Sequence, residues 1–327
     1  MSVAPYPLLM VPAIQSNPWG GTRIRDVLKK QIPAALVSQP IGESWEVSAH
    51  PNGVSRIGNG PCAGMTLPQA VEAWGTALVG ADVVRRYGAT FPLLVKLIDV
   101  NTLASVQVHP NDEQAQRLEG FPFGKSEAWY IIDAAPSAEA YIGFAPGTSP
   151  EQFTAALTGG RVRELLRPLT PHPGDCLALE PGTVHACGNG ILMLEIQQSC
   201  DITYRVYDWD RRDFEEKPRA LHIGKAMQTI DFGAQPRVFR ARGTEDTACE
   251  LMKGKHFSVF EVALRRSCAL AARAVFTSLT VVRGSCVARA GGLDLPLATG
   301  ATLLLPSGMA CTLADGAATI VGTYPTV

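Results

Sequence analysis

The sequence predicts a mainly β protein, a β-sandwich or barrel that carries α-helical insertions. Gly 31 and Pro 24 divide the chain into many short apolar runs, a spacing typical of antiparallel sandwiches and barrels. Helical patterns are confined to two stretches. With 327 residues and 46% hydrophobic content, the chain is long enough for about two domains with sizeable cores.

The expected strands are short apolar or β-branched runs bounded by glycine, proline or polar residues. They cover residues 91–100, 128–133, 176–179, 191–196 and 279–282. Residues 104–109 form a further such run, in which Gln107 and His109 are two apart. Successive side chains alternate between the faces of a strand, so these two are expected to leave the same face.

Two helical insertions are expected on this β scaffold. The first covers about residues 66–88, where apolar side chains recur near the helical period at Leu67, Val71, Trp74, Leu78 and Val83. The second covers about residues 149–167 and begins with a capping box formed by Ser149 and Gln152.

A domain boundary is expected near residue 235. The segment 208–219 is strongly charged, and Gln235-Pro236 follows a short amphipathic stretch. The sequence therefore predicts a catalytic domain over residues 1–235, which carries both insertions, and a C-terminal β domain over residues 236–327.

An internal repeat links the two domains. In both 174–185 and 300–311, a glycine turn, an apolar strand and a Pro/Gly turn lead to one residue at the same offset, His185 or Cys311. Any β-hairpin corner can have this pattern. The repeat nevertheless suggests two related β-barrels, of which only the first keeps a metal ligand.

Composition favours a small-molecule partner. Lys+Arg 29 against Asp+Glu 30 leaves a formal charge of −1, without the basic surface that binds nucleic acid or an anionic membrane. Apolar runs are too short for a membrane span, and the start has no secretory pattern, so a cytoplasmic protein is expected. The eight cysteines form no C-x-x-C pair and are expected to be reduced.

The strongest candidate for chemistry is a metal site. Gln107, His109, Glu127 and His185 offer neutral or anionic ligand atoms, the inventory for one divalent ion. Any single histidine in such a run is more often a hydrogen-bonded core residue. The set suits Zn²⁺ and also accommodates manganese, iron or cobalt. One metal per chain is expected, in the first barrel.

Five dispersed motifs between about residues 10 and 230 resemble type I mannose-6-phosphate isomerases of the short bacterial form. They are Gly42-Glu43-Ser44-Trp45-Glu46, the run 105–112, Gly124-Lys125-Ser126-Glu127, the run 182–186, and the pair 195–198 with 204–208. The resemblance implies a cupin-type β-barrel or jelly roll, while the internal repeat is the basis for expecting a second, degenerate barrel. The resemblance also implies zinc and interconversion of mannose 6-phosphate and fructose 6-phosphate.

The resemblance places the metal ligands on Gln107, His109, Glu127 and His185, with Gln107 the weakest of the four. Glu180 departs from the pattern, because many relatives have a proline in this turn. We expect this change to affect loop geometry or surface charge rather than chemistry.

Arg205 matches the family's catalytic arginine, and a guanidinium suits two adjacent oxygens. Without the resemblance, an ion pair with Asp201, Asp208 or Asp210 would be the default interpretation.

Lys125 and Glu195 are the candidate proton-transfer groups. Lys125 should point at the cavity with Glu127, and a nearby cation would lower its pKa; a solvated turn lysine is the alternative. Glu195 lies in an apolar run, 192–196, which would raise the pKa of its carboxyl group. A glutamate paired with an arginine would have the same pattern.

Lys96 and Ser105 match the phosphate-anchoring pair of the family, while Trp19 and Glu43 match pocket-lining positions. A lysine inside an apolar strand needs an anionic partner. Asp99 or Glu43 could serve as well as the substrate phosphate.

Three functions are compatible with these residues. The first is a zinc-dependent isomerase that moves a proton through an enediol(ate). The second is an Fe(II)-dependent cupin oxygenase, since two histidines and a carboxylate also form a facial triad. The third is a non-catalytic sugar-phosphate-binding cupin. The expected partner is a hexose phosphate, and the expected state is a monomer or weak homo-oligomer.

Overall fold

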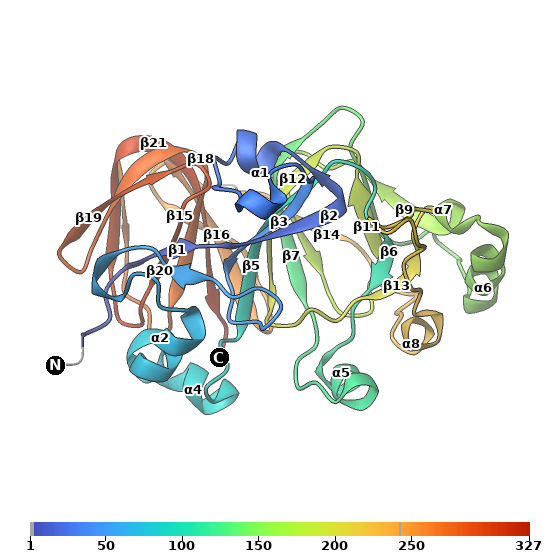
Figure 1. Ribbon diagram of the computed structural model, residues 1–327, viewed down its shortest axis with the longest axis horizontal. Helices are drawn as coiled ribbons and strands as arrows, with labels where there is room; N and C mark the ends of the chain where they lie inside the picture. Colours follow the sequence, from blue (N-terminus) through green and yellow to red (C-terminus); the bar gives the residue numbers. More distant parts are fainter. Residues whose placement is uncertain (1–2, 242) are drawn as a thin grey trace.

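Antiparallel sheets form two β units side by side along the long axis of the molecule, in a computed structural model that describes residues 3–241 and 243–327 (Figure 1). The seven-stranded and five-stranded sheets form one unit, which we call the first barrel. The nine-stranded sheet forms the other, which we call the second barrel. The predicted mainly β class, with helical insertions, is confirmed.

A seven-stranded and a five-stranded sheet make up the first barrel. The larger sheet has the order β14-β10-β7-β12-β5-β3-β2. Its strands are β2 (Ala13–Gly21), β3 (Ile41–Val47), β5 (Leu93–Val100), β7 (Glu127–Ala134), β10 (Cys176–Leu179), β12 (Ile191–Gln198) and β14 (Arg237–Phe239). The smaller sheet has the order β13-β6-β11-β8-β9. Its strands are β6 (Val106–Val108), β8 (Glu139–Phe144), β9 (Leu166–Leu169), β11 (His185–Gly188) and β13 (Tyr204–Tyr207).

The two sheets of the first barrel pack face to face. One apolar cluster contains Trp129 and Ile131 of β7 together with Ile142 of β8 and Cys187 of β11. Inward-facing residues of opposed sheets interdigitate in this way in β-sandwiches. Polar side chains that point inward beside this cluster are therefore enclosed between the sheets.

Both predicted insertions are helical. Residues 67–87 form three short helices, α2 (Leu67–Trp74), α3 (Thr76–Val79) and α4 (Ala81–Tyr87), because Gly75 and Gly80 adopt φ of +47° and +98° and interrupt them. The backbone of Ser307 donates to Leu78 O at 2.8 Å, so this insertion packs on the second barrel (Figure 1).

The second insertion forms α6 (Pro150–Gly159) and α7 (Val162–Leu165), and the capping box of Ser149 with Gln152 is confirmed. Phe153 and Val162 pack in one cluster with residues of β6 and β8. These helices therefore cover the outer face of the five-stranded sheet. Elsewhere the described residues form the α-helices α1 (Arg23–Asp26), α5 (Asp112–Glu119) and α8 (Ile223–Met227) and the short 3-10 helices η1 (Ala34–Leu36) and η2 (Gly60–Cys62).

The second barrel is a nine-stranded sheet in the order β15-β16-β21-β18-β20-β1-β4, with β17 and β19 attached to β21 and β18. Its strands are β1 (Leu8–Val11), β4 (Arg56–Ile57), β15 (Ala248–Lys253), β16 (Phe257–Leu264), β17 (Ser267–Leu270), β18 (Thr277–Ala290), β19 (Leu293–Ala298), β20 (Thr302–Leu305) and β21 (Cys311–Pro325). Register shifts interrupt the pairing of β18 with β21, and such bulges bend long strands. An apolar core lies inside.

The sheets do not divide the chain at a single point. β1 pairs with β20, with Leu8 opposite Leu304, and β14 pairs with β10, with Phe239 opposite Cys176. The N-terminal strand thus belongs to the second barrel, and a strand beyond residue 235 belongs to the first. The division at residue 235 stays a prediction.

A shared core joins the two barrels. It contains Leu194 of the seven-stranded sheet with Phe257 and Val321 of the second barrel. Polar contacts cross the same boundary, because the Tyr130 hydroxyl donates to Glu261 at 2.6 Å and the Thr302 hydroxyl donates to Glu46 at 3.0 Å. The second barrel therefore packs against the seven-stranded sheet of the first barrel and supports it.

The two copies of the internal repeat have the same local structure. Gly174 and Gly300 have φ of +88° and +89°, and the turn glycine of each copy has φ of +87° and +77°. His185 then begins β11, and Cys311 begins β21. The predicted repeat is confirmed, with a cysteine where the first copy has a histidine.

Two smaller expectations concern the cysteines and membrane spans. All eight cysteines are free, and their reduced state stays a prediction. Among the described residues, every helix is too short or too polar to cross a bilayer.

Candidate metal centre and active site

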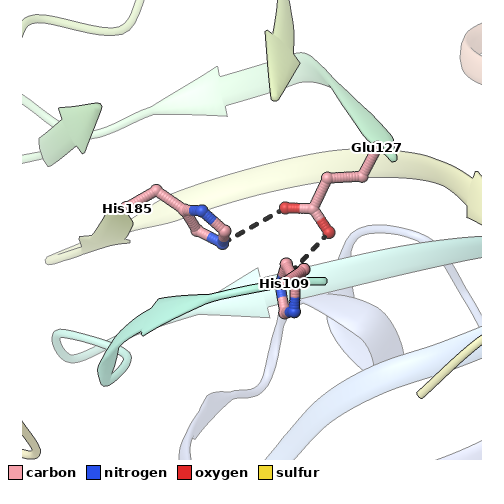
Figure 2. A group of neighbouring side chains, drawn as sticks. All are labelled: His109, Glu127 and His185. Atoms are coloured by element: carbon pink, nitrogen blue, oxygen red, sulfur yellow. Dashed lines mark ion pairs between the residues drawn. The ribbon is translucent and has the colours of Figure 1, made fainter. Parts of the chain in front are cut away.

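Three buried ligand groups converge between the two sheets of the first barrel (Figure 2). His109 directly follows β6, Glu127 begins β7 and His185 begins β11. The Glu127 carboxylate lies 3.3 Å from His185 Nε2 through Oε1 and 3.6 Å from His109 Nε2 through Oε2. One ligand atom from each residue lies within 4.8 Å of the others.

Both imidazoles are oriented by backbone carbonyls. His109 Nδ1 lies 2.8 Å from Ile202 O, and His185 Nδ1 lies 2.9 Å from Thr183 O. A carbonyl only accepts, so each Nδ1 carries the proton and each Nε2 directs its lone pair at the centre. Metal-ligating histidines are held in this way.

Burial keeps both rings neutral. It lowers the pKa of His185 to about 4, and burial together with the Lys125 ammonium lowers the pKa of His109 well below its ordinary value. Two imidazole lone pairs and the Glu127 carboxyl group therefore face one another at neutral pH. Such a set of acceptors fits a divalent cation.

Gln107 adds a fourth group. Its Nε2 lies 3.3 Å from His185 Nε2 and 3.4 Å from His109 Nε2, while its Oε1 accepts from the Ser105 hydroxyl at 3.2 Å. A half-turn of the amide presents Oε1 to the centre and leaves Ser105 bonded to Nε2, since a hydroxyl both donates and accepts. Among the described residues, Glu127 Oε1 accepts no hydrogen bond. The four predicted ligands thus fit a metal.

Lys125 is the cation nearest these acceptors. Its Nζ lies 2.6 Å from Glu127 Oε2 and 3.1 Å from His109 Nε2. Burial lowers the pKa of Lys125, but the charges of Glu127 and Glu195 outweigh burial and raise it. The sequence predicted a lowered pKa beside a cation; the surrounding side chains act in the opposite direction. Burial raises the pKa of Glu127 to about 7 against the opposing effect of Lys125.

A cavity of about 350 Å³ opens onto this centre. Its lining includes every sequence-predicted site residue except His109 and Glu127, namely Trp19, Glu43, Lys96, Ser105, Gln107, Lys125, His185, Glu195 and Arg205. The volume lies within the range of small-ligand pockets. The structure therefore brings together residues that the chain separates by up to 186 positions, from Trp19 to Arg205.

The pKa of Glu195 differs in direction from the prediction. The apolar run was expected to raise the pKa of Glu195, yet that pKa is lowered. Burial does raise it, but the ammonium groups of Lys125 and Lys96, at 3.9 and 3.5 Å, and a 3.0 Å hydrogen bond from Trp129 Nε1 outweigh burial. Glu195 is therefore ionised at neutral pH.

Lys96 has protein partners for its charge. Its Nζ lies 3.3 Å from Glu43 and 3.5 Å from Glu195, and 4.6 Å from the centre of the Trp45 ring. Asp99 is instead bound by Arg23 at 2.6 Å. Of the two carboxylates that the sequence offered, Glu43 is the one that Lys96 meets.

Arg205 lies on β13 opposite Gln107 on β6. Its Nη1 donates to Ala220 O at 2.9 Å. Asp208, one of the predicted partners, binds Arg219 at 2.6 Å instead. In the described parts of the chain Arg205 has no ion pair and its Nε has no hydrogen-bond partner. Burial lowers its pKa, and Arg205 lines the cavity without an ion-pair partner among the described residues.

Sequence reasoning did not assign five polar residues of the lining to the pocket: Asn17, Trp129, Asp201, Thr203 and Arg219. Trp129 lies two positions after Glu127 on one strand, so alternation alone could have found it. Arg219 belongs to the charged segment 208–219, which was interpreted only as part of a boundary region. Asp201 follows β12 in an irregular segment, for which the sequence carries no signal.

Comparisons with known proteins identify relatives along the whole chain. The family model "Phosphomannose isomerase type I, catalytic domain" matches residues 8–138. The chain is 37% identical over 305 residues to "Probable mannose-6-phosphate isomerase GmuF" of Bacillus subtilis, covering 92% of this chain and 94% of that protein. It is also 37% identical over 306 residues to "Mannose-6-phosphate isomerase ManA" of the same organism, with coverage of 93% and 94%.

Solved structures agree. A crystal structure of the mannose 6-phosphate isomerase from Bacillus subtilis superimposes with a TM-score of 0.88 at 32% identity, covering 98% of this chain and 100% of that one. A protein from Archaeoglobus fulgidus, described as a putative mannosephosphate isomerase, has a TM-score of 0.79 at 22% identity and covers 100% of both chains. At that identity the second match speaks for the fold alone.

Proposed function

The chain belongs to the type I phosphomannose isomerase family, and from that premise we propose that it interconverts mannose 6-phosphate and fructose 6-phosphate through an enediol(ate), with one Zn²⁺ per chain. The observation that carries the proposal is the meeting of His109, Glu127 and His185 beside a cavity. Family membership favours an isomerase over the oxygenase and over a protein that only binds sugar phosphate.

His109, Glu127, His185 and Gln107 would hold the metal. When bound, a divalent cation supplies positive charge that polarises and orients the sugar oxygens. Two neutral imidazoles, a carboxylate and an amide oxygen suit zinc, and manganese, iron or cobalt are the alternatives. Elemental analysis of protein purified without added metal distinguishes them.

Proton transfer is assigned to Glu195 and Lys125. The isomerisation moves one proton between C1 and C2 and another between O1 and O2, so it needs a base at carbon and a donor at oxygen. Glu195 is ionised and can accept the carbon-bound proton. Lys125 is charged and can stabilise the enediolate oxygen and donate a proton to it. Trp129 orients Glu195 through its 3.0 Å hydrogen bond.

The phosphate needs positive charge that the protein has not already neutralised. Lys96 and Ser105 are the proposed contacts, but Glu43 and Glu195 flank Lys96, so the three together carry a net charge of −1. We therefore assign most of the attraction for the substrate to Arg205, whose planar guanidinium can bind two oxygens at once. Trp19 and Glu43 complete the proposed substrate contacts.

The test is turnover of the purified protein. Zinc-loaded protein is mixed with mannose 6-phosphate, and fructose 6-phosphate formation is followed by a coupled dye assay, with chelator-treated protein as the control. We expect turnover that depends on metal, with one metal per chain. Folded, zinc-loaded protein without turnover would disprove the proposal. A cytoplasmic location and a monomer or weak homo-oligomer remain part of the proposal, to be tested by fractionation and sedimentation.

A further inference from the structure

We propose that Asp112 and Gln198 are positioning residues, which hold the backbone of residues 124–126 and thereby fix the Lys125 ammonium at the reacting centre. Neither residue lines the cavity, so both would act through Lys125. The inference rests on the role proposed above for Lys125.

The segment that carries Lys125 lacks the support of regular structure. It follows α5, which ends at Glu119, and precedes β7, which begins at Glu127. Lys125 is nevertheless almost fully buried, with a side-chain exposure of 5%. A side chain with four rotatable bonds is only as well placed as its backbone, so something other than strand pairing must hold residues 124–126.

Hydrogen bonds to Asp112 and Gln198 supply this support. Asp112 Oδ1 accepts from the backbone N–H of Gly124 at 2.8 Å and from Gln198 Nε2 at 2.9 Å. Gln198 Oε1 accepts from the N–H of Ser126 at 3.0 Å, and the N–H of Gln198 donates to Ser126 O at 3.2 Å. The backbone N–H groups of Gly124 and Ser126, the residues on either side of Lys125, are thus bound by one connected pair of side chains.

The backbone of the segment is also pressed against the metal-ligand segment. The N–H of Lys125 donates to Pro110 O at 2.9 Å. A Cβ at Gly124 would overlap the backbone of Pro110 and Asn111, so a glycine is required for this approach. Because Pro110 follows His109, this hydrogen bond fixes the position of the segment that carries Lys125 relative to a proposed metal ligand.

The same network reaches the proposed base. Gln198 ends β12, the strand that carries Glu195, and it is 3% exposed. Buried amides and carboxylates that satisfy one another specify a single arrangement. The pair Asp112–Gln198 therefore links three parts of the site: the metal-ligand segment, the lysine segment and the strand of Glu195.

Loss of this link should lower kcat strongly and change KM only slightly. The Lys125 Nζ lies 2.6 Å from Glu127 and 3.9 Å from Glu195. A misplacement of about 1 Å can lower a rate by about 100-fold. Substrate binding would change little, because the proposed phosphate contacts Lys96 and Ser105 come from other parts of the chain.

The experiment compares Asp112→Ala with Asp112→Asn in the zinc-loaded protein. A single oxygen, Oδ1, accepts both hydrogen bonds, and asparagine keeps it. We expect kcat to fall about 10- to 100-fold in Asp112→Ala, with KM within about threefold, and to stay within about twofold in Asp112→Asn. Gln198→Ala should resemble Asp112→Ala and supplies the test if that variant does not fold. In the double variant the two losses should not multiply.

A matched control removes the charge of the neighbouring residue. Glu113 is exposed and, like Asp112, acidic in the first turn of α5, so Glu113→Ala tests whether helix stability alone affects the rate. We expect it to behave as the parent. Hydrogen exchange supplies a readout independent of turnover: the amides of Gly124 and Ser126 should exchange faster in Asp112→Ala but not in Asp112→Asn.

The proposal is overturned if Asp112→Ala keeps the parent kcat, if Asp112→Asn falls as far as Asp112→Ala, or if the loss is accompanied by loss of bound zinc. Lys125→Met separates this failure from failure of the proposed function. If Lys125→Met turns over like the parent, the role of Lys125 is wrong. If Lys125→Met is inactive while Asp112→Ala is not impaired, only the positioning role is wrong.

Discussion

The two barrels contain the same turn and strand but differ in what lies inside. In the first, the repeat ends at His185, next to Glu127 and His109. In the second it ends at Cys311, which packs in an apolar core with Val281, Leu313 and Ile320. The glycine conformations are nearly the same in both copies. The shared backbone therefore does not determine the chemistry, which depends on the side chains that it presents.

The buried charged side chains of the first barrel also require one another. In the first barrel, Lys96, Lys125 and Glu195 are buried and lie within 3.9 Å of an opposite charge. Removing one partner leaves an uncompensated charge, which is far more costly than losing an apolar contact. A second barrel without such charges can be filled by apolar side chains, and it serves to support the seven-stranded sheet.

The largest difference between the barrels should appear on removal of the residue at the end of each repeat. His185→Ala deletes a proposed ligand, so we expect loss of bound metal and of turnover by more than about 100-fold, since even the partners of metal ligands are worth 10- to 100-fold. Cys311→Ala should keep both. Elemental analysis and the coupled assay measure the two effects. A His185→Ala protein that still binds zinc and turns over would remove the distinction between the barrels.

A second contrast uses one carboxylate from each barrel. Glu195 accepts a hydrogen bond from Trp129, and Glu261 accepts one from Tyr130, the next residue. Glu195→Gln keeps the shape but removes the proposed base, and kcat should fall by about 10²- to 10⁴-fold. Glu261→Gln should leave kcat unchanged. Equal effects on kcat would mean that Glu195 supports structure rather than proton transfer.

The third prediction concerns the pH dependence of metal binding in the first barrel. The pKa of His185 is lowered to about 4 and that of Glu127 is raised to about 7. Between these values the imidazole is already neutral while Glu127 is protonated in the metal-free protein, so the metal displaces one proton. The apparent dissociation constant should therefore rise about tenfold for each pH unit between pH 6.5 and 5.

Competition with a chromogenic chelator at several pH values measures this slope. A slope of two would show that an imidazole is protonated as well. A constant affinity over the range would show that Glu127 is already ionised.

Sequence reasoning found most of the site because the ligands follow strand periodicity and turn chemistry. Gln107 and His109 alternate on one run, and His185 follows a Pro/Gly turn that recurs in the second barrel. The mainly β class follows from the same short runs. These signals are local, and local patterns are what a single sequence carries.

Features that depend on residues far apart in the chain could not be predicted, because a single sequence carries only local patterns. The direction of the Glu195 pKa depends on Lys96 and Lys125, which reach it from β5 and from the segment before β7. The pairing of β1 with β20 joins residues about three hundred positions apart, such as Leu8 and Leu304. Neither the charge around a carboxylate nor the pairing partner of a strand can be deduced from neighbouring residues.

A fourth prediction tests the support that the second barrel gives. The Thr302 hydroxyl donates to Glu46 at 3.0 Å, and Glu46 also pairs with Lys30 at 2.6 Å. Thr302→Val removes one of several partners of a buried carboxylate, so the free energy of unfolding should fall by about 1 to 3 kcal/mol. Turnover per folded molecule should not change. Denaturant titration and the coupled assay check both statements, and a lower kcat would show that the second barrel affects the chemistry.

The smallest effect is expected at Glu180, the position in the first copy that matches Pro306 in the second. Its carboxylate lies 3.6 Å from Arg237 and 3.5 Å from the Ser126 hydroxyl, and the two ion-pair side chains are 51% and 57% exposed. Exposed pairs of this kind contribute about 0 to 1 kcal/mol, so Glu180→Ala should change the unfolding equilibrium by less than about fivefold and turnover by less than about twofold. Arg237→Ala, the matched control, should have the same small effect. A larger loss in Glu180→Ala alone would mean that its contact with Ser126, between Lys125 and Glu127, matters for the site, and that the turn before His185 is specialised beyond its copy in the second barrel.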